Sequence, residues 1–137
     1  MFSFQERQKA EGIMAVTTFE DLEVWKRSCQ LAVDVCVALH DSRDYALKDQ
    51  MQRSAISVPS NIAEGAERDS DGDFIRFLRI SKGSCGELRT QLYISERVRQ
   101  KVGQAPLAGS RPMIQETKEI SAMLQGLIRS IDSRRSS

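Results

Sequence analysis

Basic side chains recur at a helical spacing in the middle of the chain. Arg76, Arg79 and Lys82 follow one another at every third position, and Arg68 and Arg89 lie on either side of them. Arginine and lysine neutralise phosphate groups, which dominate the affinity of proteins for nucleic acids. An α-helix has about 3.6 residues per turn, so this spacing drifts around the helix and forms a broad strip. The basic strip predicts contacts with the phosphates of RNA or DNA, without reading of the bases.

A solvated charged face is the alternative interpretation of the same residues, and the sequence leaves it open. Acidic side chains accompany the strip at Asp69, Asp71, Asp73 and Glu87, and charged helical faces are usually hydrated surface. The whole chain has 20 Lys and Arg against 19 Asp and Glu, a net charge of +1. No overall field therefore attracts nucleic acid or an anionic membrane, and binding would depend on a local patch.

Asn61 and Glu64 form a second polar pair, one helical turn apart. One interpretation is a ligand site that faces a partner such as Arg53 or a residue of the following helix. The favoured interpretation is structural, because buried polar groups are generally paired. In that case the two side chains satisfy backbone groups freed by Pro59 or link two helices.

Residue combinations that support catalysis do not occur in the sequence. No nucleophile stands beside a base at a recognisable spacing, and no carboxylates are paired. A di-iron bundle needs Glu-x-x-His pairs, whereas Val37 stands three positions before His40, the single histidine. No glycine stretch leads into Gly-Lys-Ser or Gly-Lys-Thr, as in a phosphate loop. The sequence predicts a protein that is not an enzyme, with no cofactor, no metal and no small-molecule substrate.

Cysteine usage and composition indicate one packed domain in the cytoplasm. Cys29, Cys36 and Cys85 are an odd number, and no export signal is present; we expect buried apolar cysteines rather than disulfides. The 137 residues are 40% apolar and 28% charged, which is ordinary for a single globular domain. No run of about 18 apolar residues occurs, so we expect no membrane association.

Four amphipathic helices are expected to position these residues. They run from about Phe19 to His40, from Tyr45 to Glu67, from a capping box at Ser70 and Asp73 to Val102, and from Met113 to Ile131. Thr18 and Asp21 offer a further capping box at the start of the first helix. Pro59 predicts a kink or a break in the second. Residues 1–17 are expected to form a leader, 18–133 the bundle and 134–137 a tail.

The helical pattern predicts the architecture and the assembly. Short connections favour an antiparallel up-and-down four-helix bundle of the all-α class. The first and third helices carry apolar positions on more than one face, which predicts a homo-oligomer. Small residues in the third helix would allow close packing within or between subunits: Ser81, Gly83, Ser84 and Gly86.

One segment resembles the signature of a known family. The stretch Ser57-Val58-Pro59-Ser60-Asn61-Ile62-Ala63-Glu64-Gly65 follows Gln50, Arg53 and Ser54 and precedes Arg68. It is similar to the four-helix bundle proteins encoded in intervening sequences of 23S rRNA genes. Phe19-Glu20-Asp21-Leu22 and Phe77-Leu78-Arg79-Ile80 also resemble that family. Ser81-Lys82 and the chain after Ile94 depart from its pattern.

The resemblance implies a ring-like homopentamer with no known enzymatic activity. The chain is also similar to the accessory protein of diversity-generating retroelements, which binds nucleic acid and a reverse transcriptase. The motif residues Arg53, Pro59, Asn61, Glu64 and Gly65 are expected to be structural. A protein-interaction scaffold with no nucleic-acid role is the alternative function.

Overall fold

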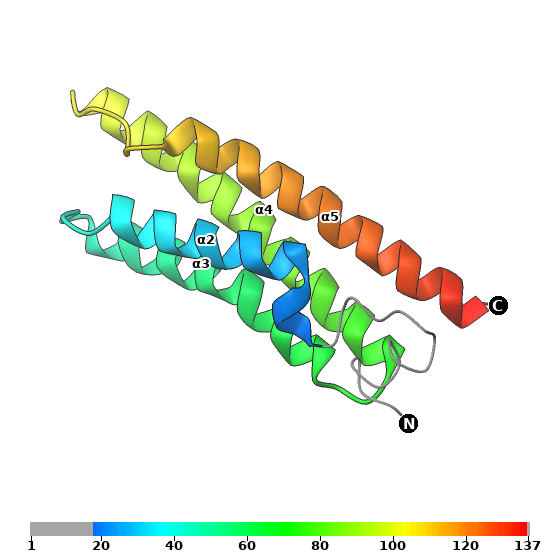
Figure 1. Cartoon of the computed structure of the whole chain (residues 1–137). Coiled ribbons are helices and arrows are strands. Elements are labelled where there is room, and N and C mark those ends of the chain that lie inside the picture. Colours follow the sequence, from blue (N-terminus) through cyan, green and yellow to red (C-terminus); the bar gives the residue numbers. More distant parts are fainter. Residues whose placement is uncertain (1–17, 137) are drawn as a thin grey trace.

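The structure, a computed structural model, describes residues 18–136 as helices joined by short connections (Figure 1). The leader predicted over residues 1–17 lies outside the described residues. In the described part of the chain, a 3-10 turn, η1 (Phe19–Asp21), precedes four α-helices. These are α2 (Glu23–Ala38), α3 (Tyr45–Ala66), α4 (Asp71–Lys101) and α5 (Ser110–Ser136). The all-α prediction is confirmed, since no strand occurs in residues 18–136.

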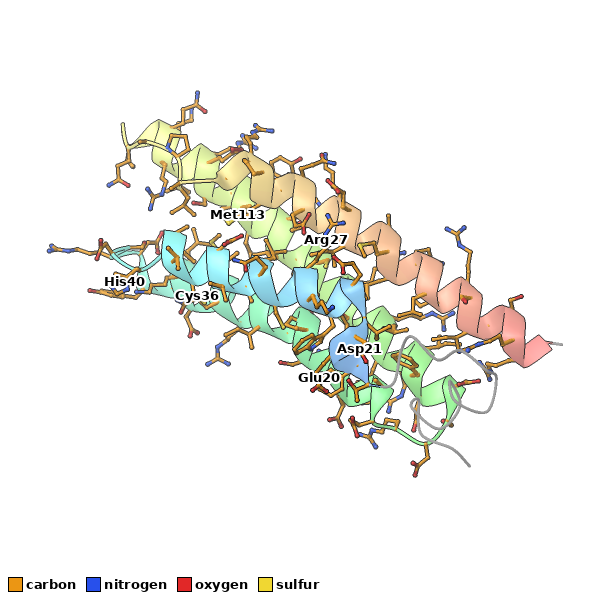
Figure 2. All side chains as sticks on the ribbon, in the orientation of Figure 1. Glu20, Asp21, Arg27, Cys36, His40 and Met113 are labelled. Carbon is orange, nitrogen blue, oxygen red and sulfur yellow. The ribbon has the colours of Figure 1, made fainter. Side chains whose placement is uncertain are left out.

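The first predicted helix is shorter than expected at both ends. Thr18 and Asp21 form the predicted capping box, but the turn that they cap is η1 rather than the start of α2. Leu22 is extended, with φ −71° and ψ 123°, and separates the turn from the helix. The α2 helix ends at Ala38. His40 lies beyond this end, exposed at the tip of the bundle (Figure 2).

Helix α3 runs from Tyr45 to Ala66 through Pro59, so the single helix predicted from Tyr45 to Glu67 is confirmed, and the alternative of a break does not occur. A proline inside a helix removes one hydrogen bond and costs about 3 kcal/mol. Pro59 is itself buried, between the core residues Val58 and Ile62. Burial of these apolar side chains is worth roughly 1.5–3 kcal/mol each, enough to offset the lost bond.

The start of α4 agrees with the sequence, and the end of α5 does not. The Ser70 hydroxyl accepts a hydrogen bond from the Asp73 amide at 3.1 Å, as the predicted cap requires. Helix α5 begins at Ser110 and extends to Ser136, so the expected tail from residue 134 is helical instead. Asp132 and Arg135, whose charged groups lie 3.7 Å apart, form an ion pair within this last part of the helix.

The helices pack side by side around one core. Helix α3 lies against α2 and α4, α4 lies against α5, and the contact between α2 and α5 is the smallest of the four. The 39–44 and 102–109 connections lie at one end of the bundle in Figure 1, and the C-terminus lies at the other. All four helices supply fully buried side chains to the core: Val35, Met51, Ile62, Phe74, Leu78, Leu88, Leu92, Ile120 and Leu124. None of the helices in the described residues is both long and apolar enough to span a membrane.

Candidate nucleic-acid interface

Two arginines of the basic strip share one aromatic ring. The guanidinium carbon of Arg76 lies 4.6 Å from the ring centroid of Phe77, and that of Arg68 lies 5.0 Å from the same centroid. A cation within about 6 Å of an aromatic face is attracted by the ring's quadrupole. Arg68, Phe77 and Arg76, here called the Phe77 cluster, therefore hold two positive charges close together where α3 ends and α4 begins.

Carboxylates partly neutralise the Phe77 cluster. Arg68 Nη2 lies 2.9 Å from Glu64 Oε1, and Arg76 Nη2 lies 3.7 Å from Asp73 Oδ1. Both arginine side chains keep about half of their surface in solvent, 45% for Arg68 and 58% for Arg76. Exposed pairs of this kind are worth about 0–1 kcal/mol, so a phosphate could replace either carboxylate at little cost.

Arg79 is the strip residue with the most freedom. It is exposed on α4, one turn after Arg76, and forms no ion pair or hydrogen bond within the described residues. Its guanidinium is hydrated on the same side of α4 as Arg76, since positions three apart are neighbours on a helix. The structure therefore brings three strip residues, Arg68, Arg76 and Arg79, to one exposed surface.

Lys82 and Arg89 instead reach toward α5. Lys82 Nζ donates to Gln125 Oε1 at 2.8 Å, and Arg89 Nε donates to the Thr117 hydroxyl at 2.9 Å. Arg89 also donates to the Thr117 carbonyl oxygen, at 3.3 Å. Both side chains are half-buried. These two cations link α4 to α5, and their charged ends lie away from the Phe77 cluster.

Gly65, from the family-like motif, sets how closely α3 approaches α4. A Cβ atom added at this position would lie 2.7 Å from Phe77 Cβ and 3.2 Å from the Phe74 carbonyl oxygen. Real Cβ atoms do not approach so closely, and neither neighbour can move without its backbone. A glycine is therefore required where the two helices meet, beside the ring that holds Arg68 and Arg76.

Hydroxyl groups join α3 to α4 along the same seam. Ser57 and Ser84 hydroxyls lie 2.8 Å apart, and the fully buried Ser81 donates to the Val58 carbonyl oxygen at 2.8 Å. Asn61 Nδ2 donates to both the carbonyl and the hydroxyl oxygen of Ser57. Asn61 thus binds the carbonyl of Ser57, two positions before Pro59, and not that of Ala55, whose usual donor the proline lacks.

The other charged motif residues pair with side chains four positions away, Arg53 inside α3 and Glu64 with Arg68 just beyond its end. Arg53 Nε lies 2.9 Å from Asp49 Oδ2, so Arg53 does not meet the Asn61 and Glu64 pair as one interpretation of the sequence expected. Glu64 pairs with Arg68 instead. Both pairs lie four residues apart on the exposed side of the helix.

Of the small residues in α4, the serines contact α3 and the glycines do not. A Cβ atom added at Gly83 or Gly86 would meet nothing within 4 Å. Close packing within the chain is therefore made at Ser81, Ser84 and, from α3, Gly65. The expectation that Gly83 and Gly86 serve close packing between helices of one chain is wrong, because no neighbouring atom lies within 4 Å of a Cβ atom built at either glycine.

The three cysteines are free, but only one is fully buried. Cys85 lies in the core, where burial raises the pKa of its thiol to about 12. Cys29 and Cys36 are half-buried on α2, against the prediction, and burial raises the pKa of the Cys29 thiol as well. A raised pKa keeps a thiol protonated at neutral pH, and the thiolate is the reactive form.

Sequence reasoning missed an ion-pair network between α2 and α5. Arg27, labelled in Figure 2, donates through Nε to Glu116 Oε2 at 2.9 Å and through Nη2 to Glu116 Oε1, and Nη2 also lies 2.9 Å from Glu119 Oε1. Arg27 Nη1 contacts the sulfur of Met123 at 3.5 Å. Arg27 and its glutamate partners are about ninety positions apart, and no pattern in the sequence indicates that they pair.

Comparisons with known proteins agree with the fold and the motif. The helices define the class: an all-α protein with four α-helices in the described residues. The model of the 23S rRNA-intervening sequence protein family matches residues 20–126. The chain therefore belongs to the 23S rRNA-intervening sequence protein family.

A solved structure has a similar fold. It is the crystal structure of a Bacteroides thetaiotaomicron protein of unknown function from the S23 ribosomal protein family. It is 22% identical to this chain, with a TM-score of 0.68, and the match covers 77% of this chain and 97% of the other. At this identity the likeness concerns the fold alone. No curated protein matches the sequence.

Proposed function

We propose that this chain is a non-enzymatic accessory bundle that binds the phosphates of RNA or DNA through Arg68, Arg76 and Arg79. The Phe77 cluster carries the proposal, because it holds two half-exposed guanidinium groups on one ring next to the unpaired Arg79. Phosphate contacts of this kind position a nucleic acid without reading its sequence. Lys82 and Arg89, predicted with the strip, are proposed to support this face by joining α4 to α5.

We further propose an antiparallel up-and-down bundle that assembles as a cytoplasmic homo-oligomer, with five subunits as first choice. Exposed apolar side chains support it on two separate faces: Ile80 and Ile94 on α4, and Val33 and Val37 on α2. Two different patches suit a head-to-tail contact, which forms a ring where the rotation between subunits closes. A ring would repeat the Phe77 cluster in every subunit, and multivalent weak contacts add up. The free cysteines fit a reducing compartment.

Mobility shift across a salt series tests the phosphate contacts. We expect binding of a structured RNA and of duplex DNA at low salt that weakens steeply as salt rises, since phosphate binding releases counterions. Arg79→Gln is expected to lower the slope of log affinity against log salt by about 0.7–0.9. The absence of any shift at low salt contradicts the proposal.

Arg129→Gln is the matched control for this experiment. Arg129 is also exposed, lies on α5 and forms no ion pair within residues 18–136. Its substitution removes the same charge from another surface and is expected to leave the salt slope unchanged. Equal effects of the two variants would mean that binding follows overall charge rather than the Phe77 cluster.

Light scattering coupled to size exclusion tests the assembly. A subunit of 15.4 kDa is expected to elute at a multiple of that mass over a wide concentration range. A monomer at every concentration would remove the ring and the multivalent part of the argument.

A protein-interaction scaffold is the second candidate, favoured by the carboxylates that already pair with Arg68 and Arg76. Affinity capture from lysate, with and without nuclease, separates the two functions. Partners retained after nuclease treatment favour the scaffold, and partners lost with it favour nucleic-acid binding.

A further inference from the structure

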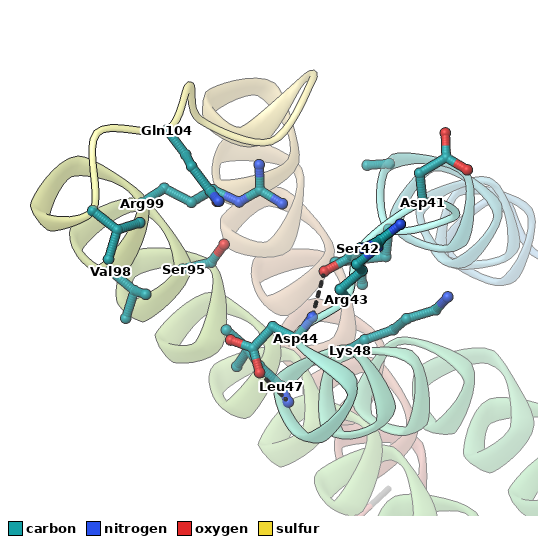
Figure 3. Close-up of a pocket in the computed structure, with 13 residues that line it drawn as sticks. Asp41, Ser42, Arg43, Asp44, Leu47, Lys48, Ser95, Val98, Arg99 and Gln104 are labelled. Atoms are coloured by element: carbon teal, nitrogen blue, oxygen red, sulfur yellow. Dashed lines mark hydrogen bonds between the residues drawn. The ribbon is translucent and has the colours of Figure 1, made fainter.

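A pocket of about 580 Å³ opens between the α2–α3 connection and the last turns of α4 (Figure 3). It lies at the end of the bundle opposite the C-terminus (Figure 1). Its walls come from the end of α2, the 39–44 connection, the start of α3 and the last turns of α4. Pockets of about 300–1,000 Å³ are the size that binds small organic molecules. None of the five basic-strip residues lines it.

The pocket has an apolar part contributed by three helices. Leu39 and Leu47 line it from the α2–α3 side, and Val98 and Val102 line it from α4. Leu39 is buried, with 2% of its surface exposed, whereas Val98 and Val102 are 43% and 62% exposed. Apolar side chains that remain exposed in a concave surface gain free energy when a ligand covers them.

The side chain of Ser95 lines this pocket. Ser95 is only 4% exposed and forms no hydrogen bond to any described residue. Two other buried serines of the same helix, Ser81 and Ser84, both bond to α3 instead. Figure 3 shows Ser95 and Arg99 on the same wall of the pocket, facing the 41–44 connection.

Cations outnumber carboxylates around the opening. Arg43, Lys48 and Arg99 line it, against Asp41 and Asp44. The Asp44 carboxylate caps α3 by accepting from the Leu47 amide, and Asp41 is 99% exposed beside His40. Neither carboxylate lies within ion-pair distance of the three cations.

Two of these cations keep donors for a ligand. Arg43 is exposed and has no ion pair or hydrogen bond within the described residues. Arg99 uses Nη1 to donate to the Ala105 carbonyl oxygen at 3.1 Å, and a guanidinium has five N–H groups in all. Lys48 Nζ donates to the His40 carbonyl oxygen at 3.1 Å, so it contributes charge more than geometry.

We propose that this pocket binds a small organic anion, with a carboxylate or phosphate head and a compact apolar body. The head accepts from Arg99, Arg43 and the Ser95 hydroxyl, and the body covers Leu47, Val98 and Val102. Such an anion is a ligand and not a substrate, because the pocket lining holds no nucleophile paired with a base. The proposal does not depend on the nucleic-acid function, since the two surfaces share no residue.

Titration of the full chain with hexanoate, hexyl phosphate and 1-hexanol tests the proposal. Amide chemical shifts report both the affinity and the place of binding. We expect hexanoate or hexyl phosphate to bind at least tenfold more tightly than 1-hexanol, with shifts centred on Ser95, Val98 and Leu47. The ratio between the two anions identifies the preferred head group. Equal binding of 1-hexanol, or shifts located elsewhere, would overturn the proposal.

Arg43→Gln and Ser95→Leu are the two test variants. Arg43→Gln removes an exposed cation that has no ion pair or hydrogen bond in residues 18–136, and it is expected to weaken binding of the preferred anion at least threefold. Ser95→Leu fills the pocket and is expected to abolish binding. Arg97→Gln is the matched control, because Arg97 is exposed on α4, the helix that carries Ser95, but lies outside the pocket. If Arg97→Gln weakens binding as much as Arg43→Gln, the anion is held by overall charge, and the pocket proposal is wrong.

Discussion

The seams between α3 and α4 and between α2 and α5 are held together by different physics. The first depends on close approach at Gly65 and on buried hydroxyl bonds from Ser81 and Ser84. The second is the smallest helix contact of the four and is bridged by Arg27 with its two glutamates. Close packing stabilises the α3–α4 contact, and ion pairs bridge the α2–α5 contact. Added bulk should therefore weaken the first, and salt or acid the second.

The two proposed binding sites also differ in where they lie relative to these contacts. The Phe77 cluster lies on the tight seam, because Phe77 packs against Gly65 while its ring holds Arg68 and Arg76. A rigid seam fixes the positions of the two charges, which favours a binding surface over a merely hydrated one. The pocket beside Ser95 lies at the end where the helical pairs separate, which leaves room for a ligand.

Gly65→Ala is expected to have the largest effect on stability. The added methyl group would lie 2.7 Å from Phe77 Cβ, so the backbones of α3 and α4 must separate. Overpacking of this kind costs about 1–3 kcal/mol. Chemical denaturation should show that loss in the free energy of unfolding.

Gly83→Ala is the control for the tight seam. A methyl group there meets nothing within 4 Å, and alanine favours a helix over glycine by about 1 kcal/mol. Gly83→Ala is therefore expected to stabilise the protein. Destabilisation by Gly83→Ala would show that a second molecule packs against this face of α4. An equal loss of unfolding free energy in Gly65→Ala and Gly83→Ala would contradict the distinction between the α3–α4 contact and the outer face of α4.

The helices could be predicted from the sequence because the apolar stripes are regular, but the neighbours of each helix face could not. Steps of three residues turn about 60° around a helix, so the basic strip passes from solvent at Arg76 to the α5 side at Lys82 and Arg89. Which side α5 occupies depends on tertiary packing. The same holds for Gly65, whose contact with Phe77 has no local signal.

Local propensity competes with packing at two places in the chain. Pro59 breaks an isolated helix, but in this chain it lies in the core and the helix continues. Residues 134–136 are polar and predicted a tail, yet the helix extends to Ser136. Ion pairs such as Asp132 with Arg135 add support that the apolar pattern does not record.

Arg27→Gln is expected to destabilise the protein by about 0.5–1 kcal/mol, less than Gly65→Ala, because the Arg27 side chain is 31% exposed and water screens its ion pairs. Adding salt should reduce the difference from wild type, since screening weakens the pairs that the variant lacks. Denaturation at low and high salt measures this change. The loss caused by Gly65→Ala should not depend on salt; parallel salt dependence of the two variants would contradict the contrast between the seams.

Acid should weaken the α2–α5 seam through Glu119. The hydrogen bond from Arg27, followed by that from Gln115, lowers the pKa of the Glu119 carboxyl below its ordinary value of 4.5. A depressed folded-state pKa means that the stabilisation is present above about pH 4.5 and is lost as the pH falls through the folded-state value. Glu119→Gln should therefore differ from wild type in unfolding free energy most near neutral pH and converge with it in acid.

Glu87→Gln, which removes an exposed carboxylate with no ionic partner in the described chain, controls for overall charge. Unfolding is followed across this pH range: a Glu119→Gln difference that stays constant into acid would show that the ionised Glu119 carboxylate does not stabilise the α2–α5 contact.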